Sequence, residues 1–193
     1  MIVAWRVSQR QFWPTAFSGE GSRQNGGRWN SIGASVVYLS DTFALAQFEV
    51  LVNVSRERLT KLDLGAARVE FSEHLVADAA QAGLPHDWRQ SSWSTTTQKL
   101  GDEWVRNGAS PILRVPSSVS PVDFNYLLNP LHRDFHTLVE SRQIDIGPFQ
   151  PFAFDSRLEG TLLPNAFIAW LREEKTIDIP SLHREFNEST GRR

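Results

Sequence analysis

Two adjacent glycines followed by an arginine form the stretch of this sequence best suited to binding a charged ligand. Gly26 and Gly27 allow the backbone to take positive φ angles and to approach a bound molecule closely. Arg28 then presents a guanidinium, which donates two parallel hydrogen bonds to a phosphate or a carboxylate. The large apolar ring of Trp29 would hold this turn against a core. From the residues alone, a tight turn with a surface arginine is the alternative.

A second candidate for chemistry is Glu49, which falls within a helix expected over residues 42–54. At 100° per residue, Leu45, Phe48 and Val52 form one apolar stripe on that helix. Glu49 lies only about 40° from Leu45, at the edge of the predicted buried face. A carboxylate in such a place is costly unless something pairs with it. The position therefore suggests a functional carboxylate, and a half-exposed glutamate paired with a nearby arginine is the alternative.

The elements that must position these residues alternate unevenly along the chain. Strands are expected over residues 2–7, 36–39, 58–64, 68–71, 111–115, 124–128, 137–146 and 152–154. Helices are expected over residues 42–54 and 97–107. Ser40-Asp41 precedes the first helix as a cap, and Gly108 suits the end of the second. Residues 12–25 mix Pro, Ser, Gly and Asn and indicate a long loop. Several strands in succession favour an α+β fold over a doubly wound parallel sheet.

Composition limits the classes of protein to consider. The chain has 193 residues, of which 40% are hydrophobic and 22% charged, enough for one substantial domain with an appendage. A net charge of −2 gives no basic footprint, so we expect no direct binding of nucleic acid. No apolar run approaches the roughly 20 residues that span a bilayer. The absence of cysteine excludes disulfides and thiolate catalysis. Together with an N-terminus unlike a signal peptide, it favours a cytoplasmic protein.

Six short motifs follow one another at residues 26–30, 37–40, 44–49, 115–117, 125–132 and 154–158. In this order they resemble the RES-domain toxins, and the resemblance covers about residues 2–158. The family is named for an arginine, a glutamate and a serine, and the matching positions here are Arg28, Glu49 and Ser117. Each motif alone is weak, whereas their succession is specific.

The resemblance implies a fold like that of ADP-ribosyltransferases, with a split, mostly antiparallel sheet. It also implies the toxin half of a toxin–antitoxin pair, with an antitoxin that carries an Xre-like helix-turn-helix domain and with a homodimer as the expected assembly. The substrate would be NAD+, with no prosthetic group. Some members hydrolyse or phosphorolyse NAD+, and others transfer its ADP-ribose to a protein; the sequence does not separate these reactions. A non-catalytic nucleotide-binding module is the alternative from another class.

The expected reaction assigns roles to three charged residues. Breaking the bond between nicotinamide and ribose expels a neutral base through an oxocarbenium-like transition state. Glu49 would stabilise the positive charge that develops on the ribose. Arg28 would bind the pyrophosphate or an attacking phosphate. Arg6, at the end of the first expected strand, would share that role, and an ordinary edge-strand arginine is the alternative.

Three uncharged residues complete the predicted site. Tyr38 would stack on nicotinamide and orient the ribose through its hydroxyl, unless it is a core tyrosine. Ser117 would hydrogen-bond the carboxamide or a ribose oxygen. We do not expect it to be a nucleophile, because no Ser–His–Asp pattern supports that role. Asn125 is a further ligand-binding candidate, equally suited to hold the loop after its strand. We expect no metal site, since His132 and His136 have no apparent third ligand and strand-like segments argue against a helix there.

The last part of the chain, residues 159–193, follows the end of the resemblance. Pro164 can open a helix, and residues 166–171 are too apolar to be left in water. We expect a helical C-terminal extension of a catalytic domain that spans residues 1–158. Its apolar face would dock on that domain, on a second copy, or on the surface that binds the antitoxin.

Overall fold

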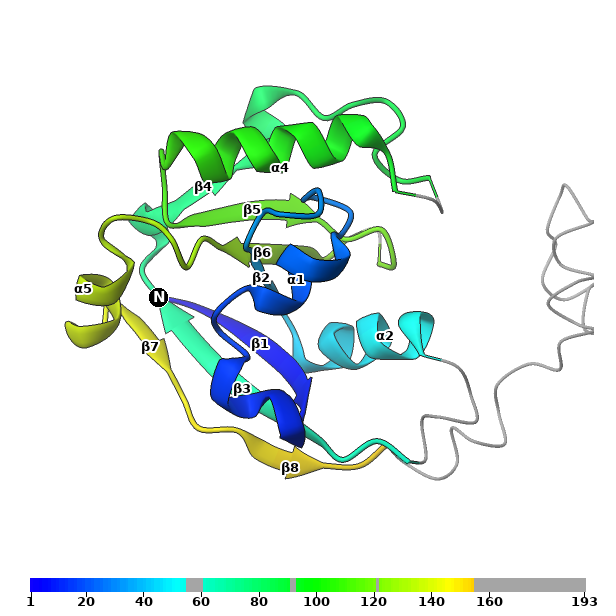
Figure 1. Cartoon of the computed structure of the whole chain (residues 1–193), viewed down its shortest axis with the longest axis vertical. Helices are drawn as coiled ribbons and strands as arrows, with labels where there is room; N and C mark the ends of the chain where they lie inside the picture. Colours follow the sequence, from blue (N-terminus) through cyan, green and yellow to red (C-terminus); the bar gives the residue numbers. More distant parts are fainter. Residues whose placement is uncertain (55–60, 91–92, 121, 155–193) are drawn as a thin grey trace, which may run out of the picture. The chain divides into compact units, whose positions relative to one another are not determined.

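The computed structural model describes residues 1–54, 61–90, 93–120 and 122–154 (Figure 1). All elements given below belong to the unit Met1–Ala153. The helical extension expected over residues 159–193 lies outside the described residues. So do residues 58–60 of the strand expected over residues 58–64; residues 61–63 form no strand, which corrects that prediction, and Leu64 begins a longer strand.

A curled mixed sheet forms the centre of this unit (Figure 1). Its strands are β1 (Ile2–Gln9), β2 (Val37–Ser40), β3 (Leu64–Phe71), β4 (Val76–Asp78), β5 (Ile112–Pro116), β6 (Phe124–Leu128), β7 (Ile144–Ile146) and β8 (Gln150–Phe152). They lie in the order β4-β5-β6-β2-β1-β3-β7, and β8 also pairs with β3. The pair β4–β5 is parallel, and the other described pairs are antiparallel. The predicted α+β class is confirmed.

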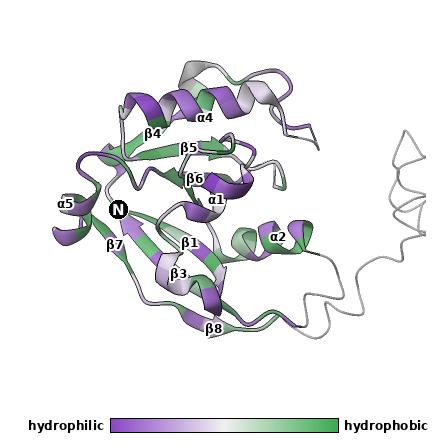
Figure 2. Ribbon diagram, viewed as in Figure 1, coloured by the Kyte–Doolittle hydropathy of each residue, from purple (hydrophilic) through white to green (hydrophobic). Residues whose placement is uncertain are grey.

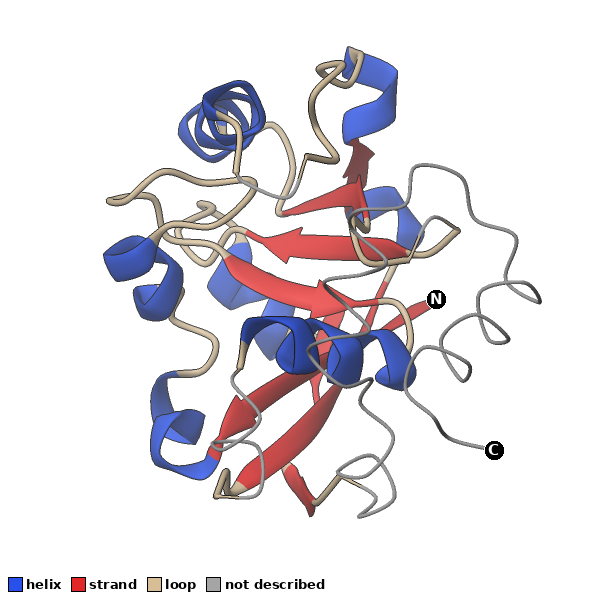
Figure 3. Ribbon diagram, turned by 90° about the vertical axis from the view of Figure 1, so that its right-hand side faces the viewer, coloured by secondary structure: helices blue, strands red, loops and turns tan. Residues whose placement is uncertain are grey.

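The sheet opens between β1 and β2. These two strands share a single register position, Trp5↔Ser40, whereas β1 and β3 stay paired from Ile2↔Phe71 to Gln9↔Leu64. Beyond that one position the two halves of the sheet diverge, and Figure 3 shows their strands running in different directions. Strands β1 and β2 and the helix that follows β2 lie next to one another where the two strands separate.

Four α-helices are described: α1 (Glu20–Asn25), α2 (Phe43–Asn53), α4 (Thr95–Asn107) and α5 (Phe135–Glu140). The helix predicted over residues 97–107 is confirmed as α4. Ser94 caps its first turn through a side-chain bond from the N–H of Thr96, and Gly108 ends it with a φ of +56°. None of the helices in the described segments is long and apolar enough to cross a membrane.

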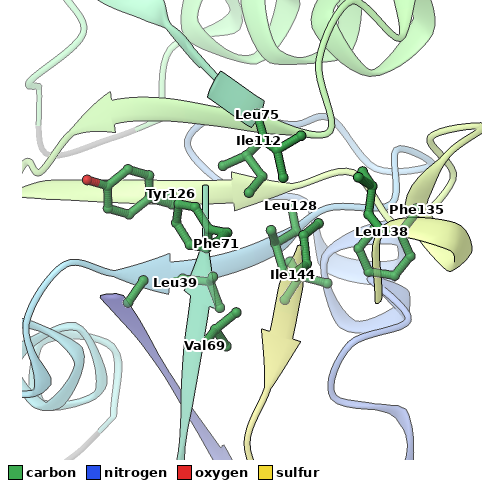
Figure 4. Close-up of a cluster of buried hydrophobic side chains, with 12 residues drawn as sticks. Leu39, Val69, Phe71, Leu75, Ile112, Tyr126, Leu128, Phe135, Leu138 and Ile144 are labelled. Atoms are coloured by element: carbon green, nitrogen blue, oxygen red, sulfur yellow. The ribbon is translucent and has the colours of Figure 1, made fainter. Parts of the chain in front are cut away.

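Two clusters of buried apolar side chains lie on opposite faces of the sheet. Neighbouring residues of β5 and β6 point alternately to the two clusters, as the pleat of a strand requires. Figure 4 shows the larger cluster, in which Phe71 packs edge-on against Tyr126 with ring centroids 5.2 Å apart. The second cluster lies beneath α4 and includes Trp29, Trp104 and Leu127. Figure 2 shows the matching pattern, with hydrophilic residues along much of α4 and hydrophobic residues in β5.

The long loop predicted over residues 12–25 is wrong. A 3₁₀ helix covers Arg10–Thr15, and α1 covers Glu20–Asn25. Helix α1 is short and polar: Arg23 and Gln24 both donate to the carboxylate of Glu20, and the hydroxyl of Ser22 bonds the backbone of Val36. A helix without an apolar stripe gives no periodic signal, so its residues look like a loop in the sequence.

The position of α2 was predicted within one residue at each end, but its cap and its buried face were not. The side chain of Thr42, and neither Ser40 nor Asp41, caps it by accepting the N–H of Leu45 at 3.0 Å. Leu45 and Ala46 are buried, whereas Phe48 and Val52 are 55% and 59% exposed. The predicted stripe is therefore wrong beyond Leu45, because the buried face of α2 runs through adjacent residues of its first turn.

The strand predicted over residues 137–146 is wrong in its first part. Helix α5 occupies Phe135–Glu140, and only Ile144–Ile146 form a strand, β7. Phe135 and Leu138, three residues apart, are both buried in the larger cluster, which is helical spacing. The same helix contains His136, so the sequence argument against a helix at that point fails.

Gly101 in the middle of α4 provides a test of how closely this helix packs. A Cβ built on Gly101 would overlap the carbonyl oxygen of Trp29, which is backbone and has no rotamer to change. We expect Gly101→Ala to lower the free energy of unfolding by about 1–3 kcal/mol in urea denaturation. Gly21→Ala is the matched control, because a Cβ there meets nothing within 4 Å and exposed helical alanine is favoured. Equal stability of the two variants would contradict the close approach.

Candidate active site

Two polar side chains from different parts of the chain meet at one carboxylate oxygen of a third residue, Glu49. Asn125 of β6 donates a 2.8 Å hydrogen bond from Nδ2 to Oε1 of Glu49 on α2. Ser117, directly after β5, lies with its Oγ 3.4 Å from the same oxygen. The structure thus brings together three of the residues predicted from the sequence, across 76 residues of chain.

The geometry of Ser117 fixes the direction of its hydroxyl. Its Oγ accepts the backbone N–H groups of Val119 and Ser120 at 3.1 and 3.2 Å. With both lone pairs occupied, the single hydroxyl hydrogen is left to point toward Glu49. Ser117 is fully buried, and this arrangement suits a holder of the carboxylate and not a nucleophile.

Sheet register places Asn125 on the face that α2 covers. Asn125 lies opposite Ser40 of β2 on one side and Val115 of β5 on the other. Ser40 in turn lies opposite Trp5, whose ring contacts Phe43 of α2 at 5.3 Å between centroids. Residues directly opposite in neighbouring strands point to the same face. Trp5, Ser40 and Asn125 therefore share the face of the sheet on which α2 carries Glu49.

Arg28 is half-buried and held by the backbone of a distant segment. Its Nη1 donates to the carbonyl oxygens of Trp88 and Gln90, each at 2.8 Å. Burial lowers the pKa of the Arg28 guanidinium, and the nearby carboxylate of Glu49 opposes that shift. Within the described segments, Nη2 and Nε of Arg28 make no hydrogen bond, so one edge of the fork is available to an anion.

The loop that carries Arg28 is fixed from two sides. The hydroxyl of Tyr38 accepts the N–H of Trp29 at 3.1 Å and donates to Oδ1 of Asn30 at 2.8 Å. From α4, Nε2 of Gln98 donates to the carbonyl of Gly27 at 3.0 Å. Gly27 is required for this packing, since a Cβ there would lie 2.5 Å from the Tyr38 hydroxyl. The loop is thus preorganised before any ligand binds.

Tyr38 therefore supports the loop with the hydroxyl that the sequence assigned to the ribose. Burial raises the pKa of Tyr38, so the phenol stays neutral and keeps both hydrogen bonds. We expect Tyr38→Phe to lower the free energy of unfolding by about 1–3 kcal/mol in urea denaturation, because Trp29 and Asn30 lose a buried partner.

The chain's other tyrosine supplies the control for that prediction. The hydroxyl of Tyr126 makes no hydrogen bond to the residues that the structure describes, and Figure 4 shows its oxygen pointing away from the apolar cluster. Tyr126→Phe should therefore change stability little. If Tyr38→Phe is as stable as the wild type, its hydroxyl does not support the loop and is free to contact substrate.

Arg6 lies on β1 next to the point where β1 and β2 separate. Its Nη1 donates to the carbonyl oxygen of Tyr38 at 3.2 Å. Its Nε is buried and has no hydrogen-bond partner among the described residues. Burial lowers the pKa of Arg6 to about 10, so the side chain is still a cation at neutral pH. Arg6 is thus a desolvated positive charge close to Tyr38.

Sequence reasoning missed the residues that hold the arginine loop. Gln98 and Asp102 lie four residues apart on α4 and bond the loop through Gly27 and through the N–H of Ser31, the latter at 2.9 Å. Their spacing shows that they share a face of the helix, but not what that face contacts. The carbonyls that hold Arg28 belong to a segment for which no element was predicted.

A hollow of about 320 Å³ opens close to Ser117 and the first turn of α2. Thr42, Ala44, Leu45, Phe48, Val119, Ser120 and Asp123 line it. Two of these lining residues, Val119 and Ser120, donate their backbone N–H groups to Ser117, which places the hollow next to the cluster around Glu49. In the described part of the chain, no three potential metal ligands come together.

Comparison with known proteins gives a consistent family. Residues 3–155 match the model of the RES domain. "Toxin Res" of Photorhabdus laumondii is 33% identical over 158 residues, which cover 81% of this chain and 97% of that protein. The "Prs ADP-ribosylating toxin" of a Sphingobium species is 30% identical over 135 residues, or 67% of this chain and 83% of that protein.

A solved structure supports the fold. The M. tuberculosis MbcT–MbcA toxin–antitoxin complex contains a chain that superposes with a TM-score of 0.62 at 18% identity. The alignment covers 83% of the present chain and 88% of the other. At this identity the likeness concerns the fold alone. The family model and the curated relatives both extend over most of the chain, and the protein therefore belongs to the RES domain family.

Proposed function

We propose that this protein is the toxin of a toxin–antitoxin pair and that it cleaves the bond between nicotinamide and ribose in NAD+. One observation carries the proposal: the carboxylate of Glu49 is fixed by Asn125 and Ser117 within electrostatic reach of Arg28. A carboxylate held in this way near a cation suits a substrate that carries both a cationic ring and a pyrophosphate.

The chemistry follows from which oxygen is occupied. Asn125 and Ser117 both bind Oε1, whereas Oε2 of Glu49 makes no hydrogen bond within the described segments and is left for the substrate. As the C–N bond breaks, its electron pair neutralises the nicotinamide ring and positive charge develops on the ribose. Oε2 stabilises that charge more strongly in the transition state than in the bound substrate, which is the condition for catalysis. Water or phosphate then adds to the ribose carbon.

The two arginines bind the anionic part of the substrate. Arg28 offers the Nη2 and Nε edge of its fork to the pyrophosphate, while its Nη1 keeps the carbonyls of Trp88 and Gln90. Arg6 adds a second positive charge, and its unpaired Nε gains a partner when an anion binds. Preorganised cations lower the cost of binding because they need not move. Tyr38 positions the arginine loop and presents its ring to nicotinamide.

The partners and location of the protein extend the same proposal. The solved complex is that of a toxin with its antitoxin, and we assign this chain a corresponding partner with an Xre-like helix-turn-helix domain. The proposal also includes a fold like that of ADP-ribosyltransferases and assembly as a homodimer. The protein would act in the cytoplasm, where NAD+ is available. Sizing chromatography with light scattering tests the dimer, and a monomeric mass would remove that element without affecting the enzyme.

Transfer of ADP-ribose to a protein is the second candidate. It is favoured by one observation, the relative named an ADP-ribosylating toxin at 30% identity. Both reactions need the same carboxylate and pass through the same transition state, and they differ in the acceptor. A binding module without turnover is disfavoured, because binding NAD+ does not require a carboxylate held beside the ribose.

Incubation of the purified full chain with NAD+, in the presence and absence of phosphate, separates these functions. Free nicotinamide with ADP-ribose indicates hydrolysis, and a phosphate-dependent rate with a phosphorylated ribose product indicates phosphorolysis. Label from NAD+ that appears on protein in a cell extract indicates transfer. Retention of all NAD+ under every condition, with the Glu49→Gln variant indistinguishable from wild type, would overturn the proposal.

A further inference from the structure

The amide of Asn125 has a defined orientation. Its nitrogen lies 2.8 Å from Oε1 of Glu49. A carboxylate only accepts hydrogen bonds, so the amide must turn its NH₂ group toward Glu49 and its carbonyl oxygen away. This assignment follows from the chemistry of the partner and does not depend on distinguishing nitrogen from oxygen. Asn125 therefore presents an acceptor, Oδ1, on the side remote from the carboxylate.

That acceptor has no donor. The side chain of Asn125 is 9% exposed, and Oδ1 is buried without a hydrogen-bond partner in the described part of the chain. A buried acceptor left unpaired is unfavourable, and an apolar side chain of the same size would avoid the cost. The unpaired atom adjoins the carboxylate to which we assign the reaction. Its natural partner is a donor that is absent from the free protein.

We propose that Oδ1 of Asn125 accepts a hydrogen bond from an N–H or O–H group of the substrate and that Asn125 thereby determines specificity. The inference rests on the proposed function, since NAD+ carries two such donors near the bond that breaks, the carboxamide of nicotinamide and the ribose hydroxyls. Nδ2 holds Glu49 while Oδ1 binds substrate, so one amide couples recognition to the placement of the carboxylate. A substrate with only acceptors at this position leaves Oδ1 unpaired.

Binding at this atom requires a small movement. Oδ1 has no exposed surface in the free chain, so neighbouring side chains must shift when the donor enters. Hydrogen bonds of active sites commonly become well aligned only in the complex with substrate. The sheet separates next to this level, because Ser40, which lies opposite Asn125, forms with Trp5 the one register pair between β1 and β2.

The test combines changes in the protein with changes in the substrate. We would measure kcat/KM for NAD+, for nicotinic acid adenine dinucleotide, which lacks the amide donor, and for an NAD+ analogue without the ribose 2′-hydroxyl. The wild type should prefer NAD+ about 10- to 100-fold over the analogue that lacks the donor bound by Oδ1. The substrate that is discriminated against identifies the donor. Any general effect of the analogue's charge cancels between the wild type and Asn125→Leu, which carry the same charge at this position.

Two variants of Asn125 complete the cycle. Asn125→Leu removes the acceptor, so it should lower kcat/KM for NAD+ and abolish the preference over that analogue. Asn125→Asp keeps an acceptor at Oδ1, so it should retain the preference even though a second carboxylate beside Glu49 slows the reaction. Thermal unfolding and circular dichroism of both variants verify the fold. If Asn125→Leu does not fold, Asn125→Asp carries the test with the analogue that lacks the 2′-hydroxyl, because that analogue has the same charge as NAD+.

The outcomes separate this inference from the proposed function. If the wild type cleaves NAD+ but the effects of protein and substrate changes are simply additive, Asn125 only supports Glu49 and the inference fails alone. Loss of the preference in Asn125→Asp would likewise overturn the role of Oδ1. If the wild type releases no nicotinamide and binds no NAD+, the proposed function fails and this inference fails with it.

Discussion

Glu49→Gln should lower kcat for NAD+ cleavage about 10²- to 10³-fold while the protein keeps its fold. Glutamine can place its amide oxygen where Oε1 lies now, so it still accepts the bonds from Asn125 and Ser117. Its NH₂ group then occupies the position of Oε2 and turns a positive dipole end toward the ribose. The variant therefore removes the charge from the transition state and leaves the hydrogen-bond network in place.

Release of nicotinamide under single-turnover conditions measures this effect directly. Glu103→Gln on α4 is the control, because it makes the same chemical change at an exposed helical position. Thermal unfolding of both variants should resemble the wild type. A Glu49→Gln protein that cleaves NAD+ at the wild-type rate would show that the carboxylate only supports the fold and that the mechanism proposed above is wrong.

Arg28→Lys should raise KM for NAD+ roughly 10- to 100-fold, which corresponds to the loss of one or two hydrogen bonds to a charged group. The arginine uses Nη1 for two backbone carbonyls and has Nη2 and Nε left for the substrate. Lysine carries a single nitrogen, so it cannot hold Trp88 and Gln90 and also bind the pyrophosphate with two donors. The charge is retained, so the geometry of the fork is what the variant tests.

Steady-state kinetics over a wide range of NAD+ concentration separates KM from kcat for this variant. Arg23→Lys is the control, because Arg23 lies on exposed α1 and pairs with Glu20. An unchanged KM for Arg28→Lys would mean that the guanidinium only hydrogen-bonds the segment around Trp88 and that the anion binds elsewhere. A drop in melting temperature without a change in KM would support the same conclusion.

Local signals in the sequence predicted the parts of this fold that local forces determine. Helix α4 ends at Gly108 as the pattern indicated, and the hydroxyl of Ser94 caps its start. Strands such as β6 are mostly apolar and end at clear turn signals, and they were placed correctly. The position of Glu49 at the margin of the buried face was also right, since it is half-buried, although Phe48 and Val52 are exposed.

Contacts between distant segments were not predictable in this way. Nothing near Gln98 indicates that it bonds the carbonyl of Gly27, 71 residues earlier. The partners of Glu49 follow from strand order and register, which place β6 beside β2. No local sequence pattern predicts that order or that register. Likewise, the sequence marked Tyr38 as a candidate but did not show that Trp29 and Asn30 occupy its hydroxyl.

The order of strands in the sheet has a consequence for the time at which the site forms during translation. The ribosome makes β1 first, yet β1 lies in the interior of the sheet, and Glu49 is 76 residues ahead of its amide partner. At about 5–20 residues per second, roughly 4–15 seconds separate the synthesis of Glu49 from that of Asn125. A nascent chain or an early-terminated product therefore has the carboxylate but neither Ser117 nor Asn125 to hold it. We expect such fragments to be inactive, so that the site is completed only when about two-thirds of the 193 residues have been made.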